Sequence, residues 1–155
     1  MMLGLKRAVM GVALTAAAFG MAASVAPAYA AKPATYTRTG NVAVSGYDTV
    51  SFFKGAPVQG LAQFQTTYNG AVYQFANAEN LAAFKAAPTK YAPQYGGYCA
   101  YAVSQNNTAP GSPQHYTVVD GKLYLNLNGS IETKWRGKQA EYIQKANANW
   151  PKVVQ

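Results

Sequence analysis

The stretch FQTTYNGAVYQF, residues 64–75, contains two β-prone runs that meet at Asn69-Gly70. Asparagine followed by glycine readily adopts the positive backbone angles of a tight hairpin turn. Asn77 follows in the position of a helix N-cap, and apolar residues then recur at helical spacing as far as Pro88, before which the helix must end. The sequence therefore predicts a β-hairpin followed by a helix.

The same order of elements recurs later in the chain. Residues 115–129, HYTVVDGKLYLNLNG, predict a second hairpin that turns at Asp120-Gly121. Ser130 is available to cap the next helix, and a final helix is expected over residues 139–148, before Trp150-Pro151.

An offset of 51 residues aligns the two halves of the chain. The aligned pairs are Asn69 with Asp120, Gly70 with Gly121, Val72 with Leu123, Tyr73 with Tyr124, Asn77 with Asn128, Phe84 with Trp135, and Tyr91 with Tyr142. These matches fit either a structural duplication or two ordinary hairpin-helix units, since many of them are turn or core residues. In both cases neither unit alone buries enough surface to be stable. We expect a small single α+β domain of two β-hairpin plus helix units that share one core.

The first 30 residues have the pattern of a secretory signal. Lys6 and Arg7 precede an apolar, alanine-rich run, and Ala28-Tyr29-Ala30 matches a small-x-small cleavage site. A membrane anchor is the competing interpretation, but the cleavage-type site favours removal of residues 1–30 and a periplasmic or secreted protein. We then expect a flexible lead-in at 31–40, a folded domain at 41–155, and no membrane span after signal cleavage.

The composition narrows the classes of partner. The formal net charge is +8, but the lysines are scattered and form no run that would follow a phosphate backbone. We therefore expect no nucleic acid partner, and instead an unidentified small ligand or an envelope protein. All four methionines lie within residues 1–30, so a methionine-based copper site is excluded from the mature chain.

The only cysteine, Cys99, lies in YGGYCAYAVS, residues 95–104, and cannot form an internal disulfide. Gly96 and Gly97 permit backbone angles or close approaches that a side chain would forbid, which predicts tight packing around the thiol. Tyrosines recur every three or four residues here, and they either wall an aromatic pocket or fill the core. Asp48 either caps a turn or closes the site. The candidate ligand-binding residues are Tyr47, Asp48, Tyr95, Tyr98, Cys99 and Tyr101.

Two alternatives use Cys99 together with His115, the only histidine. As ligands of a transition-metal ion, the pair would need carboxylates such as Asp48, Glu79 or Asp120 to complete the site. As a thiol-dependent enzyme, the pair would need a group to orient the imidazole and amides to stabilise an oxyanion. The competing interpretation makes His115 a partly exposed ring at the start of a strand.

The chain resembles the YHS domain family, small domains that occur alone or attached to heavy-metal transport ATPases and other proteins. The resemblance covers residues 42–91, and the remainder is similar to the tail of exported single-domain members. The residues that carry it are Ser45-Gly46-Tyr47, Tyr68-Asn69-Gly70, Tyr73-Gln74-Phe75, Phe84, Pro88 and Tyr91.

The family's metal-binding cysteines do not occur in this chain. Metal-associated members carry C-G-M near the start and F-C-x-x-x-C-x-x-x-F later, whereas Ser45, Ala76 and Asn80 occupy the cysteine positions here. Alanine offers no donor, and soft metals require thiolates. The resemblance thus implies a YHS-like fold without the family's metal site. We expect an exported, non-catalytic binding or accessory protein of the cell envelope, with the metal-binding protein and the thiol-dependent enzyme as alternatives.

Overall fold

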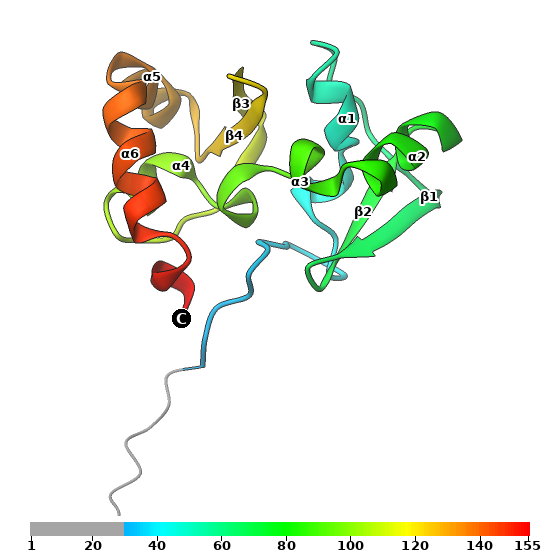
Figure 1. The fold of residues 1–155 in the computed structure, drawn as a ribbon, viewed down its shortest axis with the longest axis horizontal. Coiled ribbons are helices and arrows are strands. Elements are labelled where there is room, and N and C mark those ends of the chain that lie inside the picture. The colour runs from blue at the N-terminus through cyan, green and yellow to red at the C-terminus, as the bar shows by residue number, and fades with distance from the viewer. Residues whose placement is uncertain (1–29) are drawn as a thin grey trace, which may run out of the picture.

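The computed structural model of the 155-residue chain describes residues 30–155, so the predicted signal peptide, apart from its last residue, lies outside the described residues. Two units lie side by side, with a short linking segment between them (Figure 1). We call residues 44–86 the first unit and residues 95–137 the second unit. Each contains one two-stranded antiparallel sheet, and together with the helices they form the expected small α+β fold.

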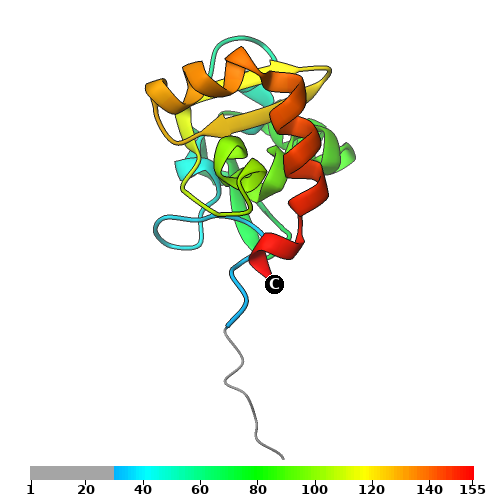
Figure 2. The ribbon, with the colours of Figure 1, turned by 90° about the vertical axis from the view of Figure 1, so that its left-hand side faces the viewer.

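The two units contain the same elements in the same order. The first unit comprises η1 (Val44–Gly46), α1 (Thr49–Phe52), β1 (Leu61–Tyr68), β2 (Ala71–Phe75) and α2 (Ala78–Ala86). After α3 (Pro88–Tyr91), the second unit comprises η2 (Gln94–Gly97) from its second residue onward, α4 (Ala100–Ser104), β3 (Ser112–Val119), β4 (Lys122–Asn126) and α5 (Gly129–Gly137). Helices α6 (Gln139–Asn149) and η3 (Lys152–Val154) follow and cover one side of the second unit (Figures 1 and 2).

The hairpins confirm both predicted turns and share one register. Asn69 and Gly70 have φ values of 47° and 77°, and Asp120 and Gly121 have values of 51° and 69°. The register irregularity between Leu61 and Gln65 recurs 51 residues later in β3. The irregularity lies at the end of each hairpin that is far from its turn. The turn sequence therefore does not explain why it recurs at the same place in both hairpins.

The offset of 51 residues also relates features that the hairpins do not include. Positive φ angles at Val44, Ser45 and Gly46, of 52°, 52° and 81°, are matched by 56°, 59° and 83° over residues 95–97. The isolated bridge between Tyr47 and Gln59 has its counterpart between Tyr98 and Pro110. The structure therefore confirms that the second unit duplicates the first, without insertion or deletion.

The helix ends agree with the sequence except at one cap. Asn77 caps α2 as predicted, by accepting a hydrogen bond from the backbone N–H of Asn80 at 2.8 Å. The prediction that Ser130 caps α5 is wrong, because the cap is Asn128, whose Oδ1 accepts the N–H of Ile131 at 3.0 Å. Ser130 already lies inside the helix, so its hydroxyl donates instead to Asn128.

Apolar side chains form two clusters rather than one shared core. The first cluster is built on Phe52, Phe75 and Phe84, and the second on Tyr124 and Trp135. Leu123 and Leu125 of β4 belong to the first cluster, although β4 is part of the second unit. Successive strand residues point to opposite faces, so β4 supplies side chains to both clusters. This strand joins the two units into one body.

The lead-in at 31–40, expected to be flexible, is held to the folded body by hydrogen bonds. The Lys32 N–H donates to the Val154 carbonyl and the Tyr36 N–H donates to the Gly96 carbonyl, both at 2.8 Å. Thr35 is only 3% exposed. These backbone contacts, together with the packing of Tyr36 on the second cluster, hold the segment in place. Within residues 30–155, no helix is both long enough and apolar enough to cross a bilayer.

The close packing of the second unit predicts a steric effect at Gly111. A Cβ at this position would meet the carbonyl oxygen of Gly97 and lie 2.8 Å from the Cβ of Leu125. We expect Gly111→Ala to lower the free energy of unfolding by about 1–3 kcal/mol in urea denaturation. Gly137→Ala is the control, since a Cβ there has no neighbour within 4 Å. Equal stability of the two variants would contradict the packing described here.

Candidate functional site

A cleft of about 360 Å³ opens between the two units, and we call it the inter-unit cleft. The lead-in, the β1–β2 turn, the segment that links the units and the C-terminal segment each supply part of its wall. The lining residues are Ala34, Thr35, Tyr68, Asn69, Tyr73, Thr89, Ala92, Pro93, Gln94, Tyr95, Gly96, Asn147, Trp150 and Pro151. Pockets of this volume lie at the lower end of the range that holds small molecules.

Gly96 brings the lead-in to the edge of the cleft. Its φ is 59°, and a Cβ at this position would meet the carbonyl oxygen of Ala34. The Tyr36 N–H donates to the Gly96 carbonyl, and the Tyr98 hydroxyl donates to the Pro33 carbonyl at 2.9 Å. The close approach expected at the glycine pair is thus confirmed, and it places residues 34–35 on the wall.

Aromatic rings form the apolar part of the cleft. Tyr73 stacks on Phe84 with ring centroids 4.8 Å apart, and Tyr68 meets Tyr73 at 6.1 Å. On the other side, Tyr95 contacts Trp150 at 6.1 Å. Tyr68 and Trp150 are half-buried, so part of each ring is open to the cleft.

The polar groups at the cleft carry no formal charge, and one pair of them is held by a hydrogen bond. The Tyr95 hydroxyl donates to Asn147 Oδ1 at 2.8 Å. Burial raises the pKa of Tyr73 to about 12 and also raises the pKa of Tyr95. Both hydroxyls therefore remain protonated at neutral pH. They can donate and accept hydrogen bonds, but they do not act as phenolate bases.

Of the ligand-binding residues predicted from the sequence, Tyr95 lines the inter-unit cleft and the others lie elsewhere. Tyr98 is buried against Tyr36, with ring centroids 5.5 Å apart. Tyr101 packs edge-on against Tyr142 at 5.2 Å, and Tyr47 accepts a hydrogen bond from Gln114 Nε2 at 3.2 Å. The structure thus does not gather the predicted residues in one pocket.

The remaining walls of the cleft come from residues that the sequence did not mark as a site. Tyr68 and Tyr73 appeared only as hairpin residues, and Asn147 and Trp150 only as part of the last helix and its end. They are up to 82 positions apart in the chain, from Tyr68 to Trp150. Local sequence patterns contain no signal that these residues meet. Only Trp150, an aromatic residue just beyond the last helix, could have been considered as a site residue from its position in the sequence.

Asp48 is a structural residue of the first unit. It is fully buried, and its Oδ1 accepts the N–H of Val50 at 2.9 Å, which makes it the N-cap of α1. Its Oδ2 accepts the N–H of Ala76 at 2.9 Å and the side-chain amide of Asn80 at 2.6 Å. Of its two predicted roles, the structure places Asp48 in the capping role, and the same carboxylate ties α1 to the β2–α2 junction.

This network predicts a large loss of stability on removal of the carboxylate. Asp48→Ala leaves buried donors of Ala76 and Asn80 without an acceptor and removes the helix cap. We expect the free energy of unfolding to fall by about 2–4 kcal/mol in urea denaturation. Asn77→Ala is the control, because it removes only the cap of α2 and should cost about 1 kcal/mol. Equal losses in the two variants would show that the carboxylate does no more than cap α1.

Cys99 is the counterpart of Asp48 in the second unit, 51 residues later, at the N-cap position of α4. The thiol is 1% exposed and its Sγ lies 3.6 Å from Asn126 Oδ1. Burial raises the pKa of Cys99 above its ordinary value, which reduces the fraction of reactive thiolate. This is the opposite of what a nucleophilic cysteine requires.

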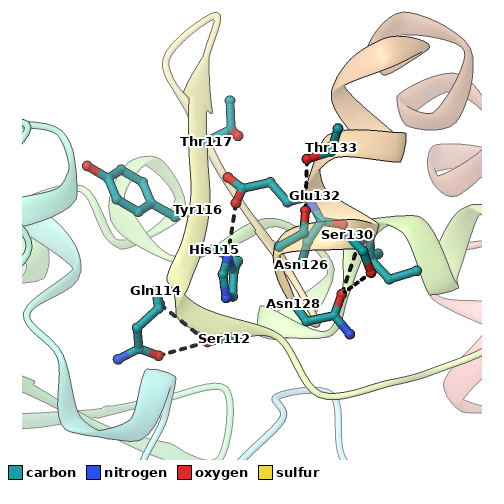
Figure 3. A network of polar contacts seen from close by, with 12 residues as sticks. Ser112, Gln114, His115, Tyr116, Thr117, Asn126, Asn128, Ser130, Glu132 and Thr133 are labelled. Carbon is teal, nitrogen blue, oxygen red and sulfur yellow. Dashed lines mark hydrogen bonds and ion pairs between the residues drawn. The ribbon is translucent and has the colours of Figure 1, made fainter.

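His115 is held by a different set of partners (Figure 3). Its Nδ1 lies 3.1 Å from Glu132 Oε2, and Arg136 donates to Glu132 Oε1 at 2.7 Å. Arg136 also donates to the Tyr116 carbonyl at 3.1 Å, so the group fastens α5 to β3. The side chain of His115 is 32% exposed, in agreement with a partly exposed strand residue.

The structure therefore gives Cys99 and His115 separate partners, Asn126 and Glu132 respectively. Among residues 30–155, no three side chains of the His, Cys, Asp and Glu types come together in a way that could hold a metal ion. The Glu132 carboxylate orients the imidazole as in a general base, but the thiol that would serve as nucleophile is paired elsewhere.

The burial of Cys99 predicts slow alkylation. We expect iodoacetamide to modify the native protein only in proportion to the small fraction of molecules that open transiently, and to modify the protein in urea at the rate of a free thiol. Ser130→Cys adds a reference thiol at an exposed position and should react at once. Equal rates for the two thiols in the native protein would contradict the buried position of Cys99.

Residues 50–95 match the family model of the YHS domain. The chain carries a YHS domain. The match confirms the resemblance seen in the sequence, and it begins in α1 and ends in η2. Apart from Tyr95, the second unit lies beyond the matched residues although it repeats the geometry of the first. The comparisons with curated proteins and with solved structures found no match.

Two of the YHS family's cysteine positions surround Asp48 in this structure. The backbone N–H of Ala76 and the side-chain amide of Asn80 both donate to Asp48 Oδ2. Asn80 Oδ1 in turn accepts a hydrogen bond from Lys54 Nζ at 2.8 Å. A carboxylate that already has several donors has its charge compensated without a cation. A hydrogen-bond network thus occupies this part of the YHS domain.

Proposed function

We propose that this YHS-domain protein is an exported, non-catalytic binding protein of the cell envelope, and that it holds a small organic molecule in the inter-unit cleft. The observation that carries the proposal is the cleft itself. Aromatic rings and amide and hydroxyl groups converge there from both units, and a few polar groups in an apolar wall are typical of ligand pockets.

The arrangement of the chain around the cleft supports a binding role. The lead-in, including the 3% exposed Thr35, is held against the body by backbone hydrogen bonds at Lys32 and Tyr36. A wall that is already ordered reduces the entropy lost when a ligand binds. The secretory pattern of residues 1–30 supports a location outside the cytoplasm.

The chemistry of the other candidate residues favours binding over catalysis. The pKa of Cys99 is raised by burial, and the imidazole of His115 is paired with Glu132. A thiol-dependent reaction needs an accessible thiolate beside a base. Within the cleft, the tyrosine hydroxyls have raised pKa values and serve as hydrogen-bonding groups.

Phenol is a suitable probe for the cleft, because it combines one ring with one hydroxyl. In backbone amide NMR spectra of the purified protein, we expect saturable shifts that concentrate at residues 34–36, 94–96 and 147–150. Trp150, which is half-buried at the cleft, should also change its fluorescence, whereas the buried Trp135 should not.

A blocking variant and its matched control make this test specific. Ala34 is exposed and lines the cleft, so Ala34→Trp should fill the cleft and weaken phenol binding roughly tenfold. Ala82→Trp makes the same change on the exposed side of α2 and should leave binding unaltered. Shifts that centre on another surface, or that persist in Ala34→Trp, would refute binding in the cleft.

A further inference from the structure

Among residues 30–155, those that line the inter-unit cleft include no Asp, Glu, Lys, Arg or His. A charged ligand would lose its hydration here and find no countercharge, which is costly in free energy. The cleft therefore favours a ligand without net charge.

The polar groups at the cleft are suited to hydroxyl groups. Asn69, Gln94 and Asn147 carry carboxamides, and Thr89 carries a hydroxyl. Every carboxamide provides both an acceptor oxygen and donor N–H groups, and every hydroxyl both donates and accepts. A ligand with several hydroxyl groups has the same dual character, so it can pair with each of these side chains whichever way the hydroxyl hydrogens turn.

One of these groups is fixed in orientation. The Tyr95 hydroxyl donates to Asn147 Oδ1 at 2.8 Å, so the Nδ2 hydrogens of Asn147 remain as donors. Asn147 is exposed on α6, where its amide can meet a ligand without rearrangement of the core. An amide held by its oxygen presents its nitrogen in one direction, which lowers the entropy cost of pairing with a ligand hydroxyl.

The half-buried rings of Tyr68 and Trp150 supply flat apolar surface at the same cleft. Aromatic faces carry partial negative charge and attract the partly positive hydrogens of C–H groups. A pyranose ring has apolar C–H faces and a rim of hydroxyl groups, and this combination matches an aromatic wall beside amides. A volume of about 360 Å³ suits a mono- or disaccharide better than a long polymer segment.

We infer that the inter-unit cleft binds an uncharged saccharide, whose ring packs on Tyr68 and Trp150 while its hydroxyl groups pair with Asn147, Gln94 and Asn69. This inference rests on the proposed binding function and names its ligand class. An exported protein would meet such molecules in the cell envelope.

The test uses sugars that share one ring and differ in charge. Amide NMR titrations of the purified protein with N-acetylglucosamine and methyl β-glucopyranoside should give saturable shifts at the same residues as phenol. Glucosamine, which carries an ammonium group, and glucuronate, which carries a carboxylate, should bind about tenfold or more weakly than the neutral sugars. Equal binding of the charged sugars would overturn the inference.

Asn147→Asp separates the saccharide inference from the general binding proposal. Aspartate keeps an acceptor for the Tyr95 hydroxyl, so the fold should be retained, but it removes the Nδ2 donors and introduces a charge. We expect sugar binding to weaken roughly tenfold while phenol binding changes little. Asn107→Asp is the matched control, since Asn107 is exposed and lies outside the cleft.

The outcomes distinguish the two proposals. Binding of phenol without binding of any sugar would refute the saccharide inference and leave the binding proposal standing. Failure of both probes to shift the cleft residues would refute both. Sugar binding that is insensitive to Asn147→Asp and to Ala34→Trp would place the saccharide site elsewhere on the protein, against the inference.

Discussion

Strand β4 holds the two units together because it is buried on both faces. Leu123 and Leu125 are 0% and 1% exposed and pack in the cluster of the first unit, while Tyr124 lies between them in sequence and packs against Trp135 of the second, with ring centroids 5.3 Å apart. An isolated two-stranded sheet is at best marginally stable in water. Each hairpin therefore depends on the neighbouring unit, and the cleft between the units depends on β4.

Equivalent backbone positions in the two units carry side chains with different roles. Equivalent positions start α1 and α4, but one is the buried carboxylate of Asp48 and the other the buried thiol of Cys99. Asp48 Oδ2 accepts hydrogen bonds from Ala76 and Asn80, whereas the Cys99 thiol lies 3.6 Å from Asn126 Oδ1. The family match to residues 50–95 falls on the unit in which the polar network lies. The two units keep the same backbone while their side chains differ. The repeat is therefore clearer in the φ angles and the strand register than in the sequence.

The saccharide inference and the structural role of the buried polar groups are consistent with one another. Inside the first unit, the buried Asp48 carboxylate is engaged with backbone N–H groups and fixes the fold. The side chain of Asn147 at the cleft, by contrast, is exposed and has hydrogen-bonding capacity left for a ligand. A buried polar group without a hydrogen-bond partner costs free energy. Polar groups that pair with a ligand therefore need a place where water can pair with them when the ligand is absent. The boundary between the units is such a place.

Local sequence patterns were enough to predict the hairpins, the capping of α2 by Asn77 and the YHS resemblance, because turns, caps and apolar periodicity depend on neighbouring residues. The cap of α5 was misplaced by two residues, since Asn128 and Ser130 can both serve as caps and only the backbone geometry shows where the helix begins. The tertiary structure decided the rest. It showed that β4 serves two clusters, that the lead-in is packed, and that Tyr95 joins Tyr68, Asn147 and Trp150 at one cleft. Such groupings depend on contacts between residues far apart in the chain, and no local pattern specifies which distant side chains will meet.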